Sequence, residues 1–133
     1  MNMGLQICIM SPEGVFWNEE VTEVILPTNT GQIGILSNHT PLITALDIGV
    51  MLVRFQGNWT NLILMGGFAL IKNNKVTILV NEAEFASNVD VDKAQQELME
   101  AEEAFNKAET PTEKIKSNLT FKRARARYQA SKA

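Results

Sequence analysis

The chain has 133 residues and a mass of 14.8 kDa, which suits one domain or a domain with a small appendage. Its single cysteine, Cys8, excludes an internal disulfide framework and cysteine-based metal sets. No apolar run approaches the roughly 20 residues of a membrane helix. Residues 1–5 carry no basic region, long apolar core or Arg/Ser-rich presequence, so we expect a protein that is neither secreted nor imported.

Charge is distributed unevenly, although the net charge is only −3. Residues 1–86 carry 7 acidic and 3 basic side chains, residues 90–113 carry 8 acidic and 2 basic ones, and residues 114–133 carry 7 basic and no acidic ones. The last two segments have opposite signs, which sets the C-terminal third apart from the rest of the chain.

The first 86 residues have the pattern of short strands separated by turns. Residues 5–10 alternate between more and less apolar side chains, as in a half-buried strand. Pro27 is expected to end a strand, and Gly66-Gly67 allows a bend. This spacing predicts an all-β sandwich or barrel, with no helix alternating with the strands. The other strand candidates are 15–17, 21–26, 42–46, 50–55, 59–65, 68–71 and 76–80, and the turns are 11–14, 47–49, 57–58 and 72–75.

The stretch from Gly31 to Pro41 interrupts this pattern. Gly31 and Gly34 lie three residues apart, and glycine in a strand marks a bulge or the close approach of another backbone. Asn38 and Pro41 favour a surface loop. We therefore expect a short irregular strand leading into an exposed loop, whose small and uncharged residues suit contact with a partner better than catalysis.

From Asp90 the apolar residues follow a helical period. Asp90 and Asp92 suit capping and compensation of the helix dipole. Thr110, Pro111 and Glu113 form the start signal of a second helix, from 111 to about 131, and the short connection predicts an antiparallel hairpin. The first helix has one apolar stripe, rich in alanine, and an acidic opposite face. The stripe is Ala94, Leu98, Ala101, Phe105 and Ala108.

The second helix has two apolar faces with basic residues between them. One face is expected to pack on the first helix, and the other remains for a further contact. The basic residues fit either a solvated surface or an acidic partner; nucleic acid is disfavoured by the acidic total and the acidic first helix. The first face is Ile115, Leu119, Ala126 and Ala130, the second is Phe121, Ala124 and Tyr128, and the basic residues are Lys122, Arg123, Arg125 and Arg127.

No catalytic constellation is recognisable. His39 is the only histidine, so neither a metal set nor a nucleophile–base pair is apparent. Residues 31–34 lack the Walker lysine and the GxGxxG frame of phosphate-binding loops. The sequence predicts no enzyme and no catalytic, cofactor or metal site. Two function classes remain: an assembly subunit, or a stand-alone β-module that binds nucleic acid or peptide with a basic helical tail.

Four segments together resemble the epsilon subunit of rotary ATP synthases, most of all its chloroplast and cyanobacterial branch. Each segment is weak alone, but the combination is highly specific and the match covers essentially the whole chain. The segments are LPTNTGQIGIL (26–36), NHTPL (38–42), MGGFA (65–69) and FKRARARY (121–128).

The resemblance implies an all-antiparallel β-sandwich over residues 1–86 and an antiparallel two-helix hairpin over residues 87–133. It implies a non-catalytic rotor subunit that connects the gamma subunit to the c-subunit ring and couples proton flow to ATP synthesis. The C-terminal helices of that family lie folded or extend toward the catalytic head, where they oppose ATP hydrolysis. The implied location is peripheral, on the stromal side of the chloroplast thylakoid membrane, or on the cytoplasmic face of the thylakoid membrane in a cyanobacterium.

The resemblance also implies partner-binding residues. Some bacterial relatives bind ATP through an Ile/Leu-Asp-x-x-Arg-Ala motif, but residues 89–94 here have Lys93 in place of the arginine, which removes a planar two-pronged donor. No bound ATP is therefore predicted, and no nucleic acid. By position, Gly31, Gln32, Ile33 and His39 face the ring, and Arg123, Arg125 and Arg127 meet acidic residues of the catalytic beta subunits.

Overall fold

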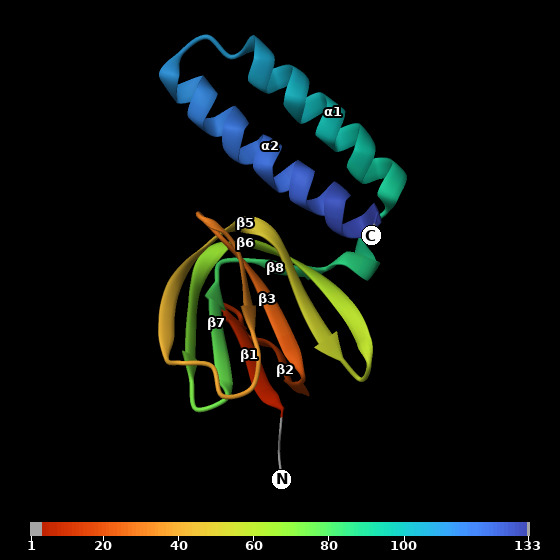
Figure 1. The fold of residues 1–133 in the computed structure, drawn as a ribbon. Helices are drawn as coiled ribbons and strands as arrows, with labels where there is room; N and C mark the ends of the chain where they lie inside the picture. The colour runs from red at the N-terminus through yellow and green to blue at the C-terminus, as the bar shows by residue number, and fades with distance from the viewer. Residues whose placement is uncertain (1–3, 133) are drawn as a thin grey trace.

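A computed structural model describes residues 4–132; residues 1–3 and 133, the outer ends of both predicted domains, lie outside the described residues. The described chain forms a β-sandwich with a helical hairpin on one end (Figure 1). The strands are β1 (Leu5–Ser11), β2 (Gly14–Val21), β3 (Glu23–Thr28), β4 (Gly31–Ile35), β5 (Leu42–Phe55), β6 (Asn58–Lys72), β7 (Lys75–Val80) and β8 (Ala83–Phe85). The helices are the short 3-10 helix η1 (Ala86–Asn88), α1 (Val91–Lys107) and α2 (Pro111–Lys132).

The strands are hydrogen-bonded in the order β2-β1-β7-β6-β5-β3-β4, and β8 pairs with β6. The predicted sandwich followed by a hairpin is confirmed. The expectation that every pair is antiparallel is wrong at one place, because β1 and β7 run parallel. Strands joined by a tight turn must be antiparallel, but β1 and β7 are far apart in the sequence and no turn fixes their relative direction.

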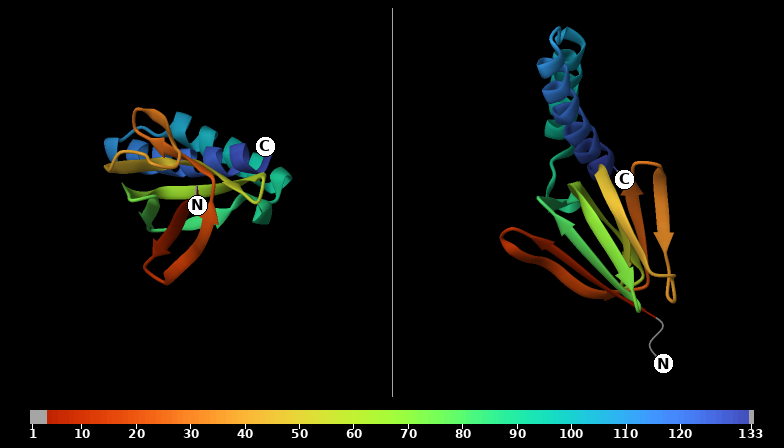
Figure 2. Two further views of the ribbon diagram at one scale, coloured as in Figure 1. Left: turned by 60° about the horizontal axis from the view of Figure 1, so that its bottom comes forward. Right: turned by 90° about the vertical axis from the view of Figure 1, so that its left-hand side faces the viewer.

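β5 and β6 are long strands that fold over and contribute to both layers of the sandwich (Figure 2). The turn predicted at 47–49 is wrong, because these residues lie inside β5. The pairing passes over Asp47 and Gly66, where both strands bend. The bend predicted at Gly66-Gly67 is confirmed, with φ of +85° and +146°, values that favour glycine.

Pro27 does not end its strand, since β3 continues to Thr28. β5 pairs only with residues 23–25 of β3, so at Pro27 β4 alone runs alongside. A proline without a backbone N–H is tolerated where one side of the strand is open. Its ring also explains Gly49, because a Cβ there would lie 2.9 Å from the Cβ of Pro27.

The main core lies between the two layers and is built from inward-pointing side chains of both. Ile7, Ile78 and Met51 are fully buried in it. Aromatic rings pack against this core, with the centroid of Trp17 5.4 Å from that of Phe55.

The helix starts are capped as the sequence predicts. Asp90 accepts hydrogen bonds from the backbone N–H groups of Asp92 and Lys93 at 3.0 and 3.2 Å. Thr110 accepts one from the N–H of Glu113 at 3.1 Å. Both caps satisfy amides that have no partner inside the helix. None of the described helices is long and apolar enough to cross a membrane.

The structure settles which apolar face of α2 meets α1, a choice that the sequence leaves open. Phe121 stacks on Phe105 of α1 with ring centroids 6.0 Å apart, so its face meets α1. Ala126 and Ala130 pack against the sandwich, and Ile115 remains 64 % exposed. Small alanines let α2 approach the sheet closely, which its phenylalanine cannot do. Of the other face, the two alanines thus meet the sandwich, while Ile115 and Leu119 remain exposed.

The bend of β6 generates a stability prediction. A Cβ at Gly67 would lie 2.1 Å from the carbonyl oxygen of Leu79, whereas a Cβ at Gly34 would meet nothing within 4 Å. We expect Gly67→Ala to lower the free energy of unfolding by about 2–4 kcal/mol, through backbone strain and overpacking. Gly34→Ala is the matched control and should change it by less than about 1 kcal/mol. Denaturant unfolding measures both, and equal stability of the two variants would contradict the bend.

Candidate functional site

The hairpin rests on the sandwich through a small apolar contact, which we call the alanine seat. Ile63 of β6 is fully buried in it. Its neighbours Leu62 and Leu64 point into the main core, so β6 is covered on both faces at this point. The seat thus joins α2 to the outside of the sheet through small buried α2 side chains, with half-buried Ile48, Val50, Met65 and Tyr128 packed around it. Its members are Ile63, Ala86, Val89, Ala94, Ala126 and Ala130.

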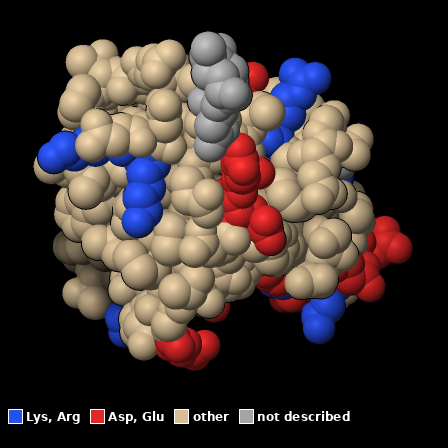
Figure 3. All heavy atoms as spheres, turned by 90° about the horizontal axis from the view of Figure 1, so that it is seen from below, with Lys and Arg blue, Asp and Glu red and all other residues tan. Residues whose placement is uncertain are grey.

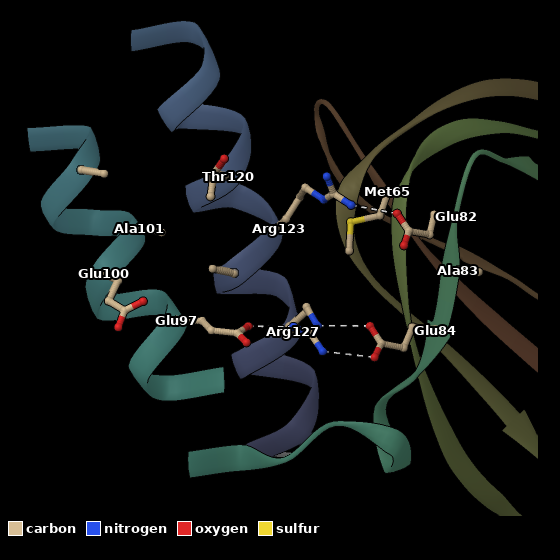
Figure 4. Close-up of a pocket in the computed structure, with 12 residues that line it drawn as sticks. Met65, Glu82, Ala83, Glu84, Glu97, Glu100, Ala101, Thr120, Arg123 and Arg127 are labelled. Carbon is tan, nitrogen blue, oxygen red and sulfur yellow. Dashed lines mark hydrogen bonds and ion pairs between the residues drawn. The ribbon is translucent and has the colours of Figure 1, made fainter. Parts of the chain in front are cut away.

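Arg127 ties α2 to both of its neighbours. Its Nε and Nη2 donate to the two carboxylate oxygens of Glu84 at 3.2 and 3.3 Å, and Nη1 donates to Glu97 of α1 at 2.7 Å (Figure 4). The hydrogen bond to Glu84 raises the pKa of Arg127 against the opposing effect of desolvation. Two-pronged arginine–carboxylate pairs are the strongest of their kind, and these side chains are only 31 and 30 % exposed.

Further ion pairs continue this line along α2. Arg123 donates to Glu82 at 2.8 Å, with both side chains at least half exposed, and Lys122 lies 3.7 Å from Asp47 at the bend of β5. An open cleft of about 730 Å³ lies between the hairpin and the sandwich, beside Met65 and these pairs. In this part of the interface, the contact between hairpin and sandwich therefore consists of ion pairs beside a cleft and not of continuous apolar packing.

The three arginines predicted to meet an acidic partner are not equivalent. Arg123 and Arg127 are engaged with carboxylates of the described chain. Arg125 is exposed and points elsewhere, with its guanidinium 5.3 Å from the ring centroid of Phe121. Of the three, only Arg125 has no carboxylate partner among the described ion pairs.

The residues predicted to face the ring lie along β4 and beyond its end. Gly31 and Gln32 are exposed and Ile33 is half-buried, at the start of the edge strand β4. His39 follows the far end of that strand, and four residue steps of about 3.3 Å separate Gly31 from Ile35. The structure therefore does not gather them at one point. A short strand leading into an exposed loop is confirmed, but the expected bulge or close backbone approach is not, because β4 pairs with β3 in one continuous register and a Cβ at Gly31 or Gly34 would meet nothing within 4 Å.

The loop after β4 is held in place by the neighbouring turn. The backbone N–H of Asn38 donates to the side chain of Asn74 at 2.6 Å, and His39 Nδ1 lies 2.7 Å from the carbonyl oxygen of Thr40. His39 thus has a local structural contact. In the described part of the chain, no three His, Cys, Asp or Glu side chains form a group that could hold a metal ion.

One exposed apolar surface of the sandwich is not predicted by the sequence. Ile43 pairs with Leu70, and Phe68 with Leu79, so all four side chains point outward from neighbouring strands. Ile43 is 74 % exposed and Phe68 60 %. The sequence does not mark these side chains as exposed, because residues on both faces of these strands are apolar and no polar–apolar alternation separates the two faces. We call this surface the outer apolar face; its members are Val15, Ile43, Phe68, Leu70 and Leu79.

The end of the sandwich away from the hairpin is poor in charge. Seen from below, most of the surface is neither acidic nor basic (Figure 3). A surface of this kind suits contact with another protein better than contact with phosphates.

Comparison with known proteins decides the family. Residues 4–86 match the family described as ATP synthase, Delta/Epsilon chain, beta-sandwich domain, and residues 87–132 match the long alpha-helix domain of the same chain. The chain belongs to the ATP synthase delta/epsilon family. It is 58 % identical to the chloroplastic ATP synthase epsilon chain of Tupiella akineta over 96 % of this chain and 98 % of that one. The corresponding protein of Chlorella vulgaris is 55 % identical, over 98 % and 97 %.

Solved structures share the fold at low identity. A chain of the Euglena gracilis mitochondrial ATP synthase, in a structure of OSCP, F1 and the c-ring, superposes with a TM-score of 0.84 at 20 % identity, over 95 % of this chain and 80 % of that one. A chain in the central stalk and c-ring structure of the Tetrahymena thermophila mitochondrial ATP synthase gives 0.68 at 16 %, over 96 % of both. The sandwich and its hairpin are thus an arrangement found in ATP synthase structures.

Proposed function

We propose that this chain is the epsilon subunit of the central stalk of a proton-translocating ATP synthase. It is a non-catalytic subunit that connects the gamma subunit to the c-subunit ring, couples proton flow to ATP synthesis and opposes ATP hydrolysis through its C-terminal helices. The observation that carries this is the identity of more than half of all residues with chloroplastic epsilon chains over nearly their full length. The same relatives support a chloroplast location, which we extend to the stromal side of the thylakoid membrane.

The alternative of a stand-alone nucleic-acid module finds no support. Arg123 and Arg127 are paired with carboxylates, so α2 offers no continuous basic stripe to a phosphate backbone. The family match also extends over both parts of the chain. We propose accordingly that residues 1–86 and 87–133 are two functional units, one for assembly and one for regulation.

The gamma subunit is proposed to cover the outer apolar face. Exposed apolar residues gathered on one sheet face mark a protein-binding surface. The hairpin contacts β5 and β6 on the other side, through Ile63 and Met65, so it leaves this face open. The low-charge end, where β4 ends and the loop to His39 follows, is then available for the ring.

Replacing the outer apolar face should abolish assembly without unfolding the chain. Phe68→Ser combined with Leu79→Ser removes two side chains, each worth about 1.5–3 kcal/mol when buried by a partner. We expect co-purification with gamma to fall at least about tenfold, and thermal unfolding of the isolated chain to change little. Met99→Ser, at a 65 % exposed apolar residue of α1, is the matched control. Retained gamma binding by the double variant would move the interface elsewhere.

The edge strand offers a second test, for the ring. Gly34 has an ordinary φ and open space around its Cβ position, so we expect valine there to leave the fold intact. If β4 packs tightly on the ring, Gly34→Val should weaken assembly by about 1–3 kcal/mol through a clash with the partner, while Gln32→Ala should be mild. Quantification of ring-bound protein after reconstitution measures both. The opposite ranking would argue against a close-packed contact.

The arginines of α2 supply the third test. Exposed ion pairs are worth about 0–1 kcal/mol each, so several must act together. We expect Arg123→Ala, Arg125→Ala and Arg127→Ala combined to raise ATP hydrolysis by the assembled enzyme about 5- to 30-fold while ATP synthesis persists. Raised salt should reproduce part of the effect. Arg125→Ala alone should act in the same direction, because Arg125 has no carboxylate partner among the described ion pairs.

A hydrolysis assay on catalytic heads reconstituted at matched occupancy measures this effect. Equal inhibition by wild-type and triple-variant protein at every salt concentration would remove the basic helix from the mechanism. The sandwich, or a purely steric block, would then be the brake.

A further inference from the structure

The geometry points to a conformational device that the proposed function does not specify. We infer that Glu82, Glu84 and Glu97 form a carboxylate latch, which holds the hairpin on the sandwich by occupying Arg123 and Arg127. The effect of this latch on ATP hydrolysis rests on the proposed function, in which the same arginines bind an acidic partner. The latch itself is a property of the isolated chain.

The first argument is the small size of the buried α2 side chains in the apolar contact. Ile63 is the one large side chain fully buried in the alanine seat, half-buried Ile48, Val50, Met65 and Tyr128 pack around it, and the buried α2 members are Ala126 and Ala130. Alanine side chains bury little area, so the seat sets the distance between helix and sheet more than it sets the strength of docking. Toward the tip of the hairpin, Leu119 is 49 % exposed and adds little to the contact.

The second argument is where the carboxylates come from. Glu82 and Glu84 lie just before and within β8, on the sandwich, whereas both arginines lie on α2. These pairs therefore cross between the two parts of the chain and must break when α2 leaves. Glu97 belongs to α1 and binds the third nitrogen of the Arg127 guanidinium, so Arg127 joins α1, α2 and β8 at one point.

The third argument is the occupancy of the donors. All three guanidinium nitrogens of Arg127 have a carboxylate oxygen within 3.3 Å, and Arg123 has one at 2.8 Å. A competing anion, whether a carboxylate of another protein or a phosphate, must displace Glu84 or Glu97 before it can bind Arg127, whereas Arg123 is held through one nitrogen only. Capture of Arg127 by such an anion therefore breaks the contacts that hold the hairpin there.

The latch predicts that replacing the glutamates and replacing the arginines of the same ion pairs have opposite effects on the inhibition of ATP hydrolysis. Removing the arginines takes away the groups that a partner needs. Glu82→Gln with Glu84→Gln keeps those groups and weakens only the docked state. In the assembled enzyme the glutamine variant should therefore inhibit ATP hydrolysis more strongly than wild type, whereas the arginine variants inhibit less.

The direct test uses the isolated chain and needs no ATP synthase. Spin labels at Lys72→Cys on the sandwich and Lys116→Cys on α2, in a Cys8→Ser background, report the distance between the two parts by pulsed electron paramagnetic resonance. We expect one narrow distance at low salt for the parent protein. The Glu82→Gln, Glu84→Gln variant should raise the ratio of displaced to docked hairpin about fivefold or more, and high salt should do likewise in the parent.

A charge-matched control separates the latch from net charge. Glu100→Gln with Glu102→Gln removes two negative charges from α1, and neither carboxylate takes part in a described ion pair. This control should keep the docked distance. Glu82→Arg with Arg123→Glu reverses one pair and should restore docking relative to Glu82→Arg alone.

The outcomes test the latch separately from the proposed inhibition of ATP hydrolysis by the arginines. If the double glutamine variant stays as docked as the control variant, the alanine seat suffices and the latch is wrong. If its hairpin is released in the isolated chain but hydrolysis by the reconstituted enzyme is unchanged, the latch stands and the proposed role of the arginines in inhibition fails.

Discussion

β6 bends at Gly67, where only a residue without a Cβ fits beside the carbonyl oxygen of Leu79. A side chain at this position would push β7 away from β6, and the strands on both sides depend on that pairing. Because β5 and β6 bend together, this one pair of strands contributes to both layers of the sandwich. One half carries the outer apolar face and the other half carries Ile63 in the alanine seat. Two separate contact surfaces therefore depend on one local backbone geometry.

The contact between hairpin and sandwich divides its tasks between two kinds of interaction. Apolar packing in the alanine seat fixes where α2 lies, since alanine permits only a close and small contact. Ion pairs from Arg123 and Arg127 then fix its orientation across an open cleft. Partly exposed ion pairs weaken with salt, whereas burial of Ile63 does not, so the two contributions can be separated experimentally.

The features that the sequence predicts correctly are local ones. The turn at Asn73-Asn74, with φ of +53° and +62°, and the caps at Asp90 and Thr110 follow from chemistry within four residues. The turn predicted at 47–49 is wrong because Gly49 makes room for the ring of Pro27 and does not form a turn. Turn propensity cannot distinguish these two uses of glycine.

The features that the sequence does not predict depend on distant residues. The parallel pairing of β1 with β7 has no local signal. The partners of Arg123 and Arg127 on the sandwich lie 41 and 43 residues away, in a segment with no motif of its own. Two apolar faces on α2 are visible in the sequence, but which one meets the sheet depends on the size of the opposing side chains. The site residues therefore stay a prediction from the resemblance, while their contacts within the chain come from the structure alone.

The segregation of charge between the two helices has a physical consequence for docking. Acidic α1 and basic α2 could neutralise each other, yet among the described residues only Arg127 and Glu97 form an ion pair between them. The other α2 ion pairs reach the sandwich, to Asp47, Glu82 and Glu84. The ion pairs of α2 are thus mainly with the sandwich and not with α1. A helix paired with its own hairpin partner would keep its ion pairs in any movement of the hairpin, whereas α2 would lose those to Glu82 and Glu84 in the hairpin release that we propose.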